Sequence, residues 1–308
     1  MITVVNLNPS IDKSIAVDGF HYGSMNRVRD ARSDAGGKAV NVAIVAARLG
    51  LDVRCIGILR EENGHIIEDK LKQNGIEHET VWLPGSIRTN MKVLDREKSI
   101  VTELNESGQS VTAEALEAIT NRIRAKASTS DYMVFTGSLP PGCPKDYYAK
   151  LIACLGDECK CVIDAEGETL KAGINACPYL IKPNKMELEL ELNRTLLGIE
   201  DVVQASRGFI ERGIGRVAVS LGADGALLSD ADATYYAQGL NVAVQSTVGA
   251  GDSMVAGMLY GFEKGLSTDE VLRHAVAAAS ATIMEAGTGL MKKENYNDLR
   301  KKISIKKV

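Results

Sequence analysis

Short apolar runs alternate along the chain with longer segments whose apolar residues recur at helical spacing. Alternation of this kind is typical of α/β proteins, in which helices cover both faces of a mostly parallel sheet. Gly75 follows one helical segment at the position of a C-cap. The predicted strands are Ile2–Leu7, Val53–Ile58, Tyr132–Thr136, Cys161–Asp164, Tyr179–Lys182 and Arg216–Ser220, and the predicted helices are Lys38–Leu49, Glu61–Asn74, Lys145–Leu155, Ile199–Arg212, Ser253–Glu263 and Thr268–Met284.

Two regions depart from this alternation. Residues 11–34 and 80–104 contain short segments in which apolar and polar residues alternate, such as Ile15-Ala16-Val17. They predict antiparallel strands inserted between the βα units. A small accessory sheet shared by both insertions would cover the strand ends as a lid. The chain contains no internal repeat and no low-complexity linker, so we expect one domain over residues 1–308 with this lid attached.

Composition and charge exclude several classes of protein. The chain has 308 residues and a net charge of −4, with no block of five or six basic residues within its body. A nucleic-acid or anionic-membrane surface is therefore not expected. No apolar stretch approaches the 18 residues of a membrane span, and Met1–Asn8 reads as a strand rather than a signal peptide. Any anion that binds here should be small and held by a few groups.

The cysteines favour a reducing compartment. A chain of this length builds its core without disulfide bonds, and the cysteine spacing lacks the paired two-residue intervals of zinc sites. We therefore expect reduced thiols in a cytoplasmic protein. The six residues are Cys55, Cys143, Cys154, Cys159, Cys161 and Cys177.

A glycine-rich turn before a helix is the strongest chemical signal. In Val248-Gly249-Ala250-Gly251-Asp252, the two glycines let the backbone approach a ligand closely. The helix that follows offers free N–H groups and a partial positive charge, which suit a phosphate. Asp252 could accept a proton from an attacking hydroxyl. The alternative is structural, with Asp252 as an ordinary N-cap after a glycine turn.

Two segments upstream of this turn have both a functional and a structural interpretation. The glycines of Ser220–Gly225 would let the backbone run beside a nucleotide, or the segment forms a plain β-hairpin. In Lys182–Glu187, Asn184 and Glu187 lie three apart on one helical face. They could hold Mg²⁺ through water beside a triphosphate, or they could form a capping box.

The N-terminal third carries a second group of anion-binding signals. Asp12 follows the first predicted strand, at the sheet edge where ligands of α/β proteins bind. Gly36-Gly37-Lys38 opens a helix that also contains Asn41. Arg27 and the segment Arg88-Thr89-Asn90 lie in the predicted lid. Together these groups would suit a phosphate ester and sugar hydroxyls.

Taken together, these segments resemble the PfkB (ribokinase-like) carbohydrate kinases over essentially the whole chain. The two signatures of that family match Gly36–Asn41 and Val248–Asp252, and Gly137–Gly142 and Lys182–Glu187 add to the match. The sequence is most similar to the branch that phosphorylates fructose 1-phosphate or tagatose 6-phosphate. It departs from that branch at Ala39, where a third glycine is usual, and the added methyl group would lie near the sugar.

The resemblance implies a three-layer αβα sandwich with a small β-sheet lid, and transfer of the γ-phosphoryl group of ATP to a sugar phosphate. The implied product is fructose 1,6-bisphosphate made from fructose 1-phosphate, with tagatose 6-phosphate or fructose 6-phosphate as alternative substrates. It also implies Mg²⁺, allows a monovalent cation, and suggests a homodimer formed through the lid. In the implied site, Asp252 is the base, and the anion hole is formed by Gly249, Ala250 and Gly251. Mg²⁺ is supported through water by Asn184 and Glu187. The nucleotide is lined by Lys182, Asn184, Ser220, Gly222, Ala223 and Gly225, and the sugar phosphate is held by Asp12, Arg27, Gly37, Lys38, Asn41, Arg88, Asn90, Ser138 and Asp252.

Two other classes of function remain to be weighed. A nicotinamide-dependent dehydrogenase needs a G-x-G-x-x-G turn directly after its first strand, and Asn6–Asp12 contains no glycine. A regulatory protein that binds a sugar phosphate without catalysis should have lost its base or its anion loop, yet Asp252 and Gly249–Gly251 are intact. A kinase is the interpretation that uses all of these segments.

Overall fold

A computed structural model describes residues 1–308, and a ten-stranded sheet forms its centre. The strand order is β14-β13-β12-β11-β10-β9-β8-β1-β4-β5. In this order, the strands β11, β10, β9, β8, β1, β4 and β5 pair in parallel, each with the next. The strands β11, β12, β13 and β14 pair antiparallel with one another. The strands are β1 (Ile2–Asn6), β4 (Val53–Arg60), β5 (Glu77–Leu83), β8 (Tyr132–Thr136), β9 (Lys160–Asp164), β10 (Leu180–Ile181), β11 (Val217–Ser220), β12 (Gly225–Ser229), β13 (Thr234–Gln238) and β14 (Ile305–Lys307).

Helices pack on both faces of this sheet and enclose two separate apolar cores. Strand β1 supplies both, because Ile2 and Val4 point into one core while Val5 points into the other. One face is covered by α1 (Lys38–Arg48), α2 (His65–Gln73), α8 (Ala250–Glu263), α9 (Thr268–Ile283) and α10 (Lys293–Arg300), and the other by α3 (Ala113–Ala125), α4 (Tyr147–Leu155), α5 (Gly167–Asn175), α6 (Lys185–Leu192) and α7 (Ile199–Glu211). The predicted three-layer αβα architecture is confirmed.

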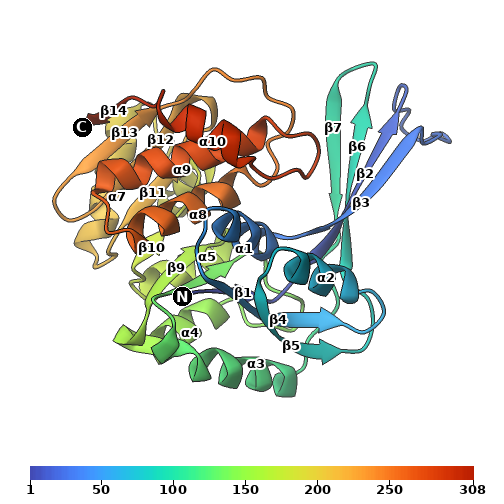
Figure 1. The fold of residues 1–308 in the computed structure, drawn as a ribbon, viewed down its shortest axis with the longest axis horizontal. Coiled ribbons are helices and arrows are strands. Elements are labelled where there is room, and N and C mark those ends of the chain that lie inside the picture. Colours follow the sequence, from blue (N-terminus) through green and yellow to red (C-terminus); the bar gives the residue numbers. More distant parts are fainter.

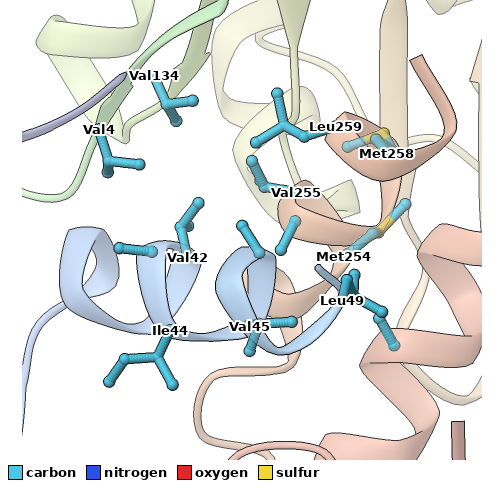
Figure 2. Close-up of a cluster of buried hydrophobic side chains, with 14 of the residues drawn as sticks. Val4, Val42, Ile44, Val45, Leu49, Val134, Met254, Val255, Met258 and Leu259 are labelled. Carbon is cyan, nitrogen blue, oxygen red and sulfur yellow. The ribbon is translucent and has the colours of Figure 1, made fainter. Parts of the chain in front are cut away.

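Helices α1 and α8 lie side by side against the sheet. Figure 2 shows Val42 and Val45 of α1 facing Val255 and Leu259 of α8, close to Val4 on β1. All five side chains are fully buried. Because the two helices share one close-packed core, their N-termini are held in a fixed relation to each other.

The accessory sheet projects from one side of this body (Figure 1). It has four strands in the order β3-β2-β6-β7. They are β2 (Ser10–Val17), β3 (Asp30–Gly36), β6 (Arg88–Asp95) and β7 (Ile100–Asn105). The predicted lid sheet therefore exists and is built from both insertions.

Two details of the lid differ from the prediction. Residues 80–83 belong to β5, which pairs in parallel with β4 at the edge of the main sheet. Most of its residues are only partly buried, so β5 lacks the fully buried apolar run of the central strands. The lid is also not antiparallel throughout, because β2 and β6 pair in parallel at its centre. Both strands leave the carboxyl edge of the main sheet, after β1 and β5, and so run in the same direction.

Strands β12, β13 and β14 and helices α3, α5 and α10 were not among the predicted elements. Further differences concern the ends of helices. Helix α2 begins at His65 instead of Glu61, because Gly64 closes a turn by donating its N–H to the carbonyl of Arg60 at 2.8 Å. Helix α8 begins three residues earlier than predicted, at Ala250. Gly75, with φ of 68°, takes the left-handed conformation expected of it.

All six cysteines are free thiols, and no helix is both long and apolar enough to cross a membrane.

Candidate active site

A cleft of about 940 Å³ opens at the carboxyl ends of the parallel strands, beside the lid. Four neighbouring strands end at it, and the residues at or just after their last positions line it: Asn8 after β1, Thr136 on β8, Asp164 on β9 and Lys182 after β10. The N-termini of α1 and α8 and one face of the lid complete the walls. Fourteen of the predicted site residues line this cleft, namely Asp12, Gly37, Lys38, Asn41, Arg88, Asn90, Ser138, Lys182, Asn184, Glu187, Ser220, Gly249, Gly251 and Asp252.

Asp252 lies in the first turn of α8, and its N-cap is Gly249. Gly249 has φ of 76°, a left-handed conformation that favours glycine. The N–H groups of Gly251 and Asp252 donate to no acceptor in the protein, as is usual for the first turn of a helix. The alternative in which Asp252 is the N-cap is therefore wrong. The helix presents free amides to the cleft beside a carboxylate.

Asp252 is buried, with 5% of its surface exposed, and accepts a hydrogen bond at Oδ2 from Asn41 Nδ2 at 2.8 Å. Burial, reinforced by the negative charge of Asp164, raises the pKa of Asp252 to about 6, although Lys38, Asn41 and Lys182 act in the opposite direction. A carboxyl group with this pKa is largely ionised at pH 7 and can still take up a proton, which is the property a general base requires.

A buried carboxylate holds two lysines next to these amides. Lys182 Nζ lies 3.2 Å and Lys38 Nζ 3.5 Å from the same oxygen, Oδ1 of Asp164. Burial opposes the ionisation of Asp164, but the two ammonium groups outweigh it and hold the pKa of Asp164 below its ordinary value. Lys182 Nζ is also next to Gly251, where a Cβ atom would lie 3.4 Å away. The group carries one more positive than negative charge.

Asp12 occupies the lid side of the cleft and is almost fully buried. Its Oδ1 accepts hydrogen bonds from Ser10 Oγ at 2.8 Å and from Asn90 Nδ2 at 3.2 Å. Its Oδ2 accepts none and lies 3.7 Å from Lys92 Nζ. One oxygen of this carboxylate is thus free to accept a hydrogen bond from a ligand.

Arg88 lies on the same face of the lid and forms no ion pair with a carboxylate of the chain. Its guanidinium donates to the carbonyls of Asn8 at 3.2 Å and Glu106 at 3.0 Å and to Asn90 Oδ1 at 3.4 Å. Asn8 in turn donates from Nδ2 to Ser138 Oγ at 3.2 Å. Arg88 is therefore fixed in position while its charge is left without a counter-ion.

Asn184 and Glu187 form a complete capping box at the start of α6. Asn184 Oδ1 accepts from the Glu187 N–H at 2.8 Å, and Glu187 Oε2 accepts from the Asn184 N–H at 2.9 Å. The structural interpretation of this pair is therefore correct. Both side chains also line the cleft, and Glu187 Oε1 has no hydrogen-bond donor. Burial raises the pKa of Glu187 above its ordinary value.

A second cavity of about 400 Å³ adjoins the cleft and is walled mainly by small and apolar residues. Ser220–Gly225 forms one wall as an antiparallel β11–β12 connection, in agreement with the hairpin interpretation. Helices α8 and α9 form the opposite wall. The predicted nucleotide residues Gly222, Ala223 and Gly225 lie here, while Asn184, Ser220 and Gly251 border both spaces.

Among the predicted site residues, Ala250 lines the second cavity and Arg27 lines neither space, and many residues of the cleft were not predicted. Arg27 is exposed in the connection between β2 and β3 and does not reach the cleft of its own chain, because the lid hairpin carries it outward. Asp164 and Lys92 were missed. The signal for Asp164 was a carboxylate closing a buried strand, and for Lys92 its spacing of two from Asn90 along a strand, which puts both on one face.

Comparisons with known proteins agree with this geometry. Residues 5–295 match the family model described as pfkB family carbohydrate kinase. The chain is 36% identical to the 1-phosphofructokinase of Rhodobacter capsulatus, covering 99% of this chain and 97% of that protein, and 34% identical to that of Escherichia coli K12, covering 94% and 93%.

Solved structures show the same fold. Phosphofructokinase-2 from Escherichia coli in complex with substrates and products superposes with a TM-score of 0.93 at 28% identity over 98% of each chain, and the potassium complex of the same enzyme with 0.92. The resemblance drawn from the sequence motifs is confirmed by the family match and by the full-length relatives. The chain therefore belongs to the pfkB family of carbohydrate kinases.

Proposed function

We propose that this carbohydrate kinase transfers the γ-phosphoryl group of ATP to fructose 1-phosphate and forms fructose 1,6-bisphosphate. The observation that carries the proposal is the position of Asp252, a buried carboxylate with a pKa of about 6 beside unpartnered helix amides. It shares one cleft with Arg88, whose charge has no counter-ion. The names of the Rhodobacter capsulatus and Escherichia coli relatives support the choice of sugar phosphate.

Asp252 acts as the general base in the proposed reaction. Its carboxylate takes the proton of the accepting sugar hydroxyl as the oxygen attacks the γ-phosphorus, and the bond from that phosphorus to the departing ADP oxygen breaks. Asn41 holds the carboxylate in place through its hydrogen bond to Oδ2. General bases of this kind contribute roughly 10²–10⁴ in rate.

The amides of Gly251 and Asp252, with Lys38 and Lys182, stabilise the charge on the moving phosphoryl group. Amides at a helix N-terminus donate to anions at no cost of reorganisation. The two lysines add a net positive charge, since they share the single carboxylate of Asp164. Phosphoryl transfer depends mainly on such positioning and electrostatic stabilisation.

The second cavity would hold the adenine, and Mg²⁺ would accompany the phosphates. The apolar walls and the glycines of the β11–β12 connection suit a flat ring system. The residues fit Mg²⁺ in its usual form, in which it keeps several waters and binds phosphates with one or two carboxylates. Glu187 offers one free oxygen for this purpose, and no cluster of three acidic, histidine or cysteine side chains forms a dedicated metal cage.

We also propose that two copies of the chain associate through their lids. The lid strand β7 is exposed along its whole length, and the large apolar side chains of Ile100, Val101 and Leu104 are each more than half exposed. Ile100 and Leu104 lie on one face of the strand and Val101 on the other, and β7 is the edge strand of the lid, so it offers both apolar side chains and an unpaired backbone edge to a partner. Light scattering on the purified chain should give the mass of a dimer, and Leu104→Glu should give a monomer; a wild-type monomer would contradict this proposal.

An ADP-release assay across three substrates tests the proposed reaction. Fructose 1-phosphate should give a higher kcat/KM than fructose 6-phosphate or tagatose 6-phosphate, and a preference for either of the latter would reassign the substrate. Asp252→Asn should lower kcat by about 10²–10⁴ while ATP binding survives. Near-normal turnover of Asp252→Asn would remove Asp252 from the mechanism.

A further inference from the structure

We propose that Lys92 is a specificity-determining residue that donates a hydrogen bond to a ring hydroxyl of the sugar, next to the hydroxyl that donates to Asp12. The proposal rests on the proposed function, since it takes the substrate to be a ketohexose phosphate. It concerns a side chain that no sequence motif singled out.

The register of the lid sheet turns Lys92 toward the cleft. Strand β6 pairs with β2 so that Asn90 lies beside Asp12. Side chains alternate between the two faces of a strand, so Lys92 shares the cleft face with Arg88 and Asn90, and all three line the cleft. The side chain of Lys92 is only 11% exposed.

Lys92 and Asp12 leave matching hydrogen-bond capacity unused. Their atoms Nζ and Oδ2 are 3.7 Å apart, which is too long for a hydrogen bond. Neither atom has another hydrogen-bond partner, since both donors that reach Asp12 bind its other oxygen. Both residues line the cleft, and neither atom is among the fully buried side-chain atoms that lack a partner, so both atoms are open to a ligand in the cleft. A ligand with a donor and an acceptor side by side would satisfy both atoms, and adjacent hydroxyls on a furanose ring have that form.

Charge separates the role of Lys92 from that of Arg88. Lys92 faces the carboxylate of Asp12 and stands opposite Glu103 in the β6–β7 register. Its charge is therefore compensated. Arg88 feels the more distant charges of Asp12 and Glu106 but forms no ion pair with any carboxylate, and a planar guanidinium suits a phosphate dianion. The lid thus assigns the phosphate ester to Arg88 and the ring hydroxyls to Asp12 and Lys92.

Removing the ammonium group should reduce selectivity for the sugar. Lys92→Met is expected to lower kcat/KM for fructose 1-phosphate by about 10- to 100-fold, the range for a lost hydrogen bond from a charged donor. The KM for ATP should stay unchanged. Lys98→Met is the matched control, because Lys98 also lies 3.7 Å from a carboxylate, that of Asp95, but is exposed outside the cleft; it should behave as wild type.

Deoxy analogues of the substrate separate a hydroxyl contact from a phosphate contact. The 3-deoxy and 4-deoxy forms of fructose 1-phosphate should be poorer substrates for the wild type. On the analogue that lacks the hydroxyl contacted by Lys92, the kcat/KM of Lys92→Met should be close to that of the wild type, because the hydrogen bond is already absent. An equal loss on the parent sugar and both analogues would overturn the inference, because Lys92 would then act on the ester or on the fold.

Two further measurements keep the test decisive. Lys92→Gln retains a donor of shorter reach, and its melting temperature should match that of the wild type. Its kcat/KM should fall below the wild-type value on fructose 1-phosphate but lie close to it on the analogue that lacks the contacted hydroxyl. This variant tests the inference even if Lys92→Met misfolds. If the wild type releases no ADP with any of the three sugar phosphates, the proposed function fails. A wild type that turns over fructose 1-phosphate but is matched by both Lys92 variants refutes only the role of Lys92.

Discussion

The hydrogen bond from Asn41 to Asp252 should set the lower pH limit of activity. Asn41→Leu keeps the approximate volume of the side chain and removes the donor at 2.8 Å from Oδ2. That donor favours the ionised carboxylate. Without it the pKa of Asp252 must rise, and because the base must be ionised, the acid limb of the pH–rate profile must move to higher pH.

The size of the shift follows from the energy of the lost contact. A hydrogen bond to a charged group contributes about 1.5–3 kcal/mol, and about 1.4 kcal/mol corresponds to one pKa unit. From its position at about 6, the pKa of Asp252 should rise by about one to two units. The ionised fraction at pH 7 would then fall from about nine-tenths to between about half and one-tenth.

The measurement is kcat/KM for the sugar phosphate from pH 5 to 9, followed by ADP release. The position of the acid limb is the readout, because Asn41 also lines the cleft proposed to bind the sugar, and its loss can lower the maximal rate. Asn90→Leu is the matched control: the same change removes a donor from Asp12 and should leave the acid limb in place. An acid limb that stays near pH 6 in Asn41→Leu would refute the reasoning.

Three further predictions concern other parts of the structure. Gly249→Ala should lower kcat at least 10-fold, since Gly249 has φ of 76° and a Cβ would lie 2.9 Å from Leu290 Cδ2. Gly265→Ala is the control, because Gly265 has φ of 63° but no neighbour within 4 Å; it should lower the melting temperature and leave kcat in the ADP-release assay unchanged. Arg88→Met should raise the KM for the sugar phosphate more than the KM for ATP, and equal changes in steady-state kinetics would move Arg88 out of the sugar site. Burial lowers the pKa of His274 from 6.5 to about 4. The contribution of the neutral imidazole to the free energy of unfolding is therefore complete above pH 6.5 and is lost as the pH falls toward 4. Urea titrations should show the free energy of unfolding falling over this pH range in the wild type, and falling less in His274→Gln.

The parallel strands at the centre of the main sheet were predictable, because they are short apolar runs bounded by helical patterns, whereas the antiparallel strands β12, β13 and β14 were not among the predicted strands. The lid was predictable in existence but not in its boundary or its pairing. Strand β5 lies at the edge of the main sheet and is only partly buried, so no buried apolar run marks it, and only the directions in which β2 and β6 leave the main sheet make them parallel. Both properties depend on contacts between segments far apart in the sequence.

The site was predictable where glycines and helix starts fix the chemistry locally. Gly249 to Asp252 and the start of α1 carry their signal within a few residues. The place of Asp164 at the end of a strand and the spacing of Lys92 from Asn90 do not reveal what these residues do, because their contacts with Lys38, Lys182 and Asp12 are made across the fold. Arg27 is the opposite case: an arginine in a lid segment was predicted to bind the sugar phosphate, yet it lies away from the cleft.

The parallel pairing at the centre of the lid has a consequence for how the chain folds. Asp12 and Asn90, which it joins, are separated by 78 positions. Neither hairpin alone can make that contact. The pairing of β1 with β4 and of β4 with β5 in the main sheet brings the two hairpins together, because β2 follows β1 and β6 follows β5, and so shortens the loop that remains to be closed. We expect the lid to become protected from hydrogen exchange after the main sheet during refolding. A nascent chain would then acquire the cavity proposed for the nucleotide before it could enclose a sugar.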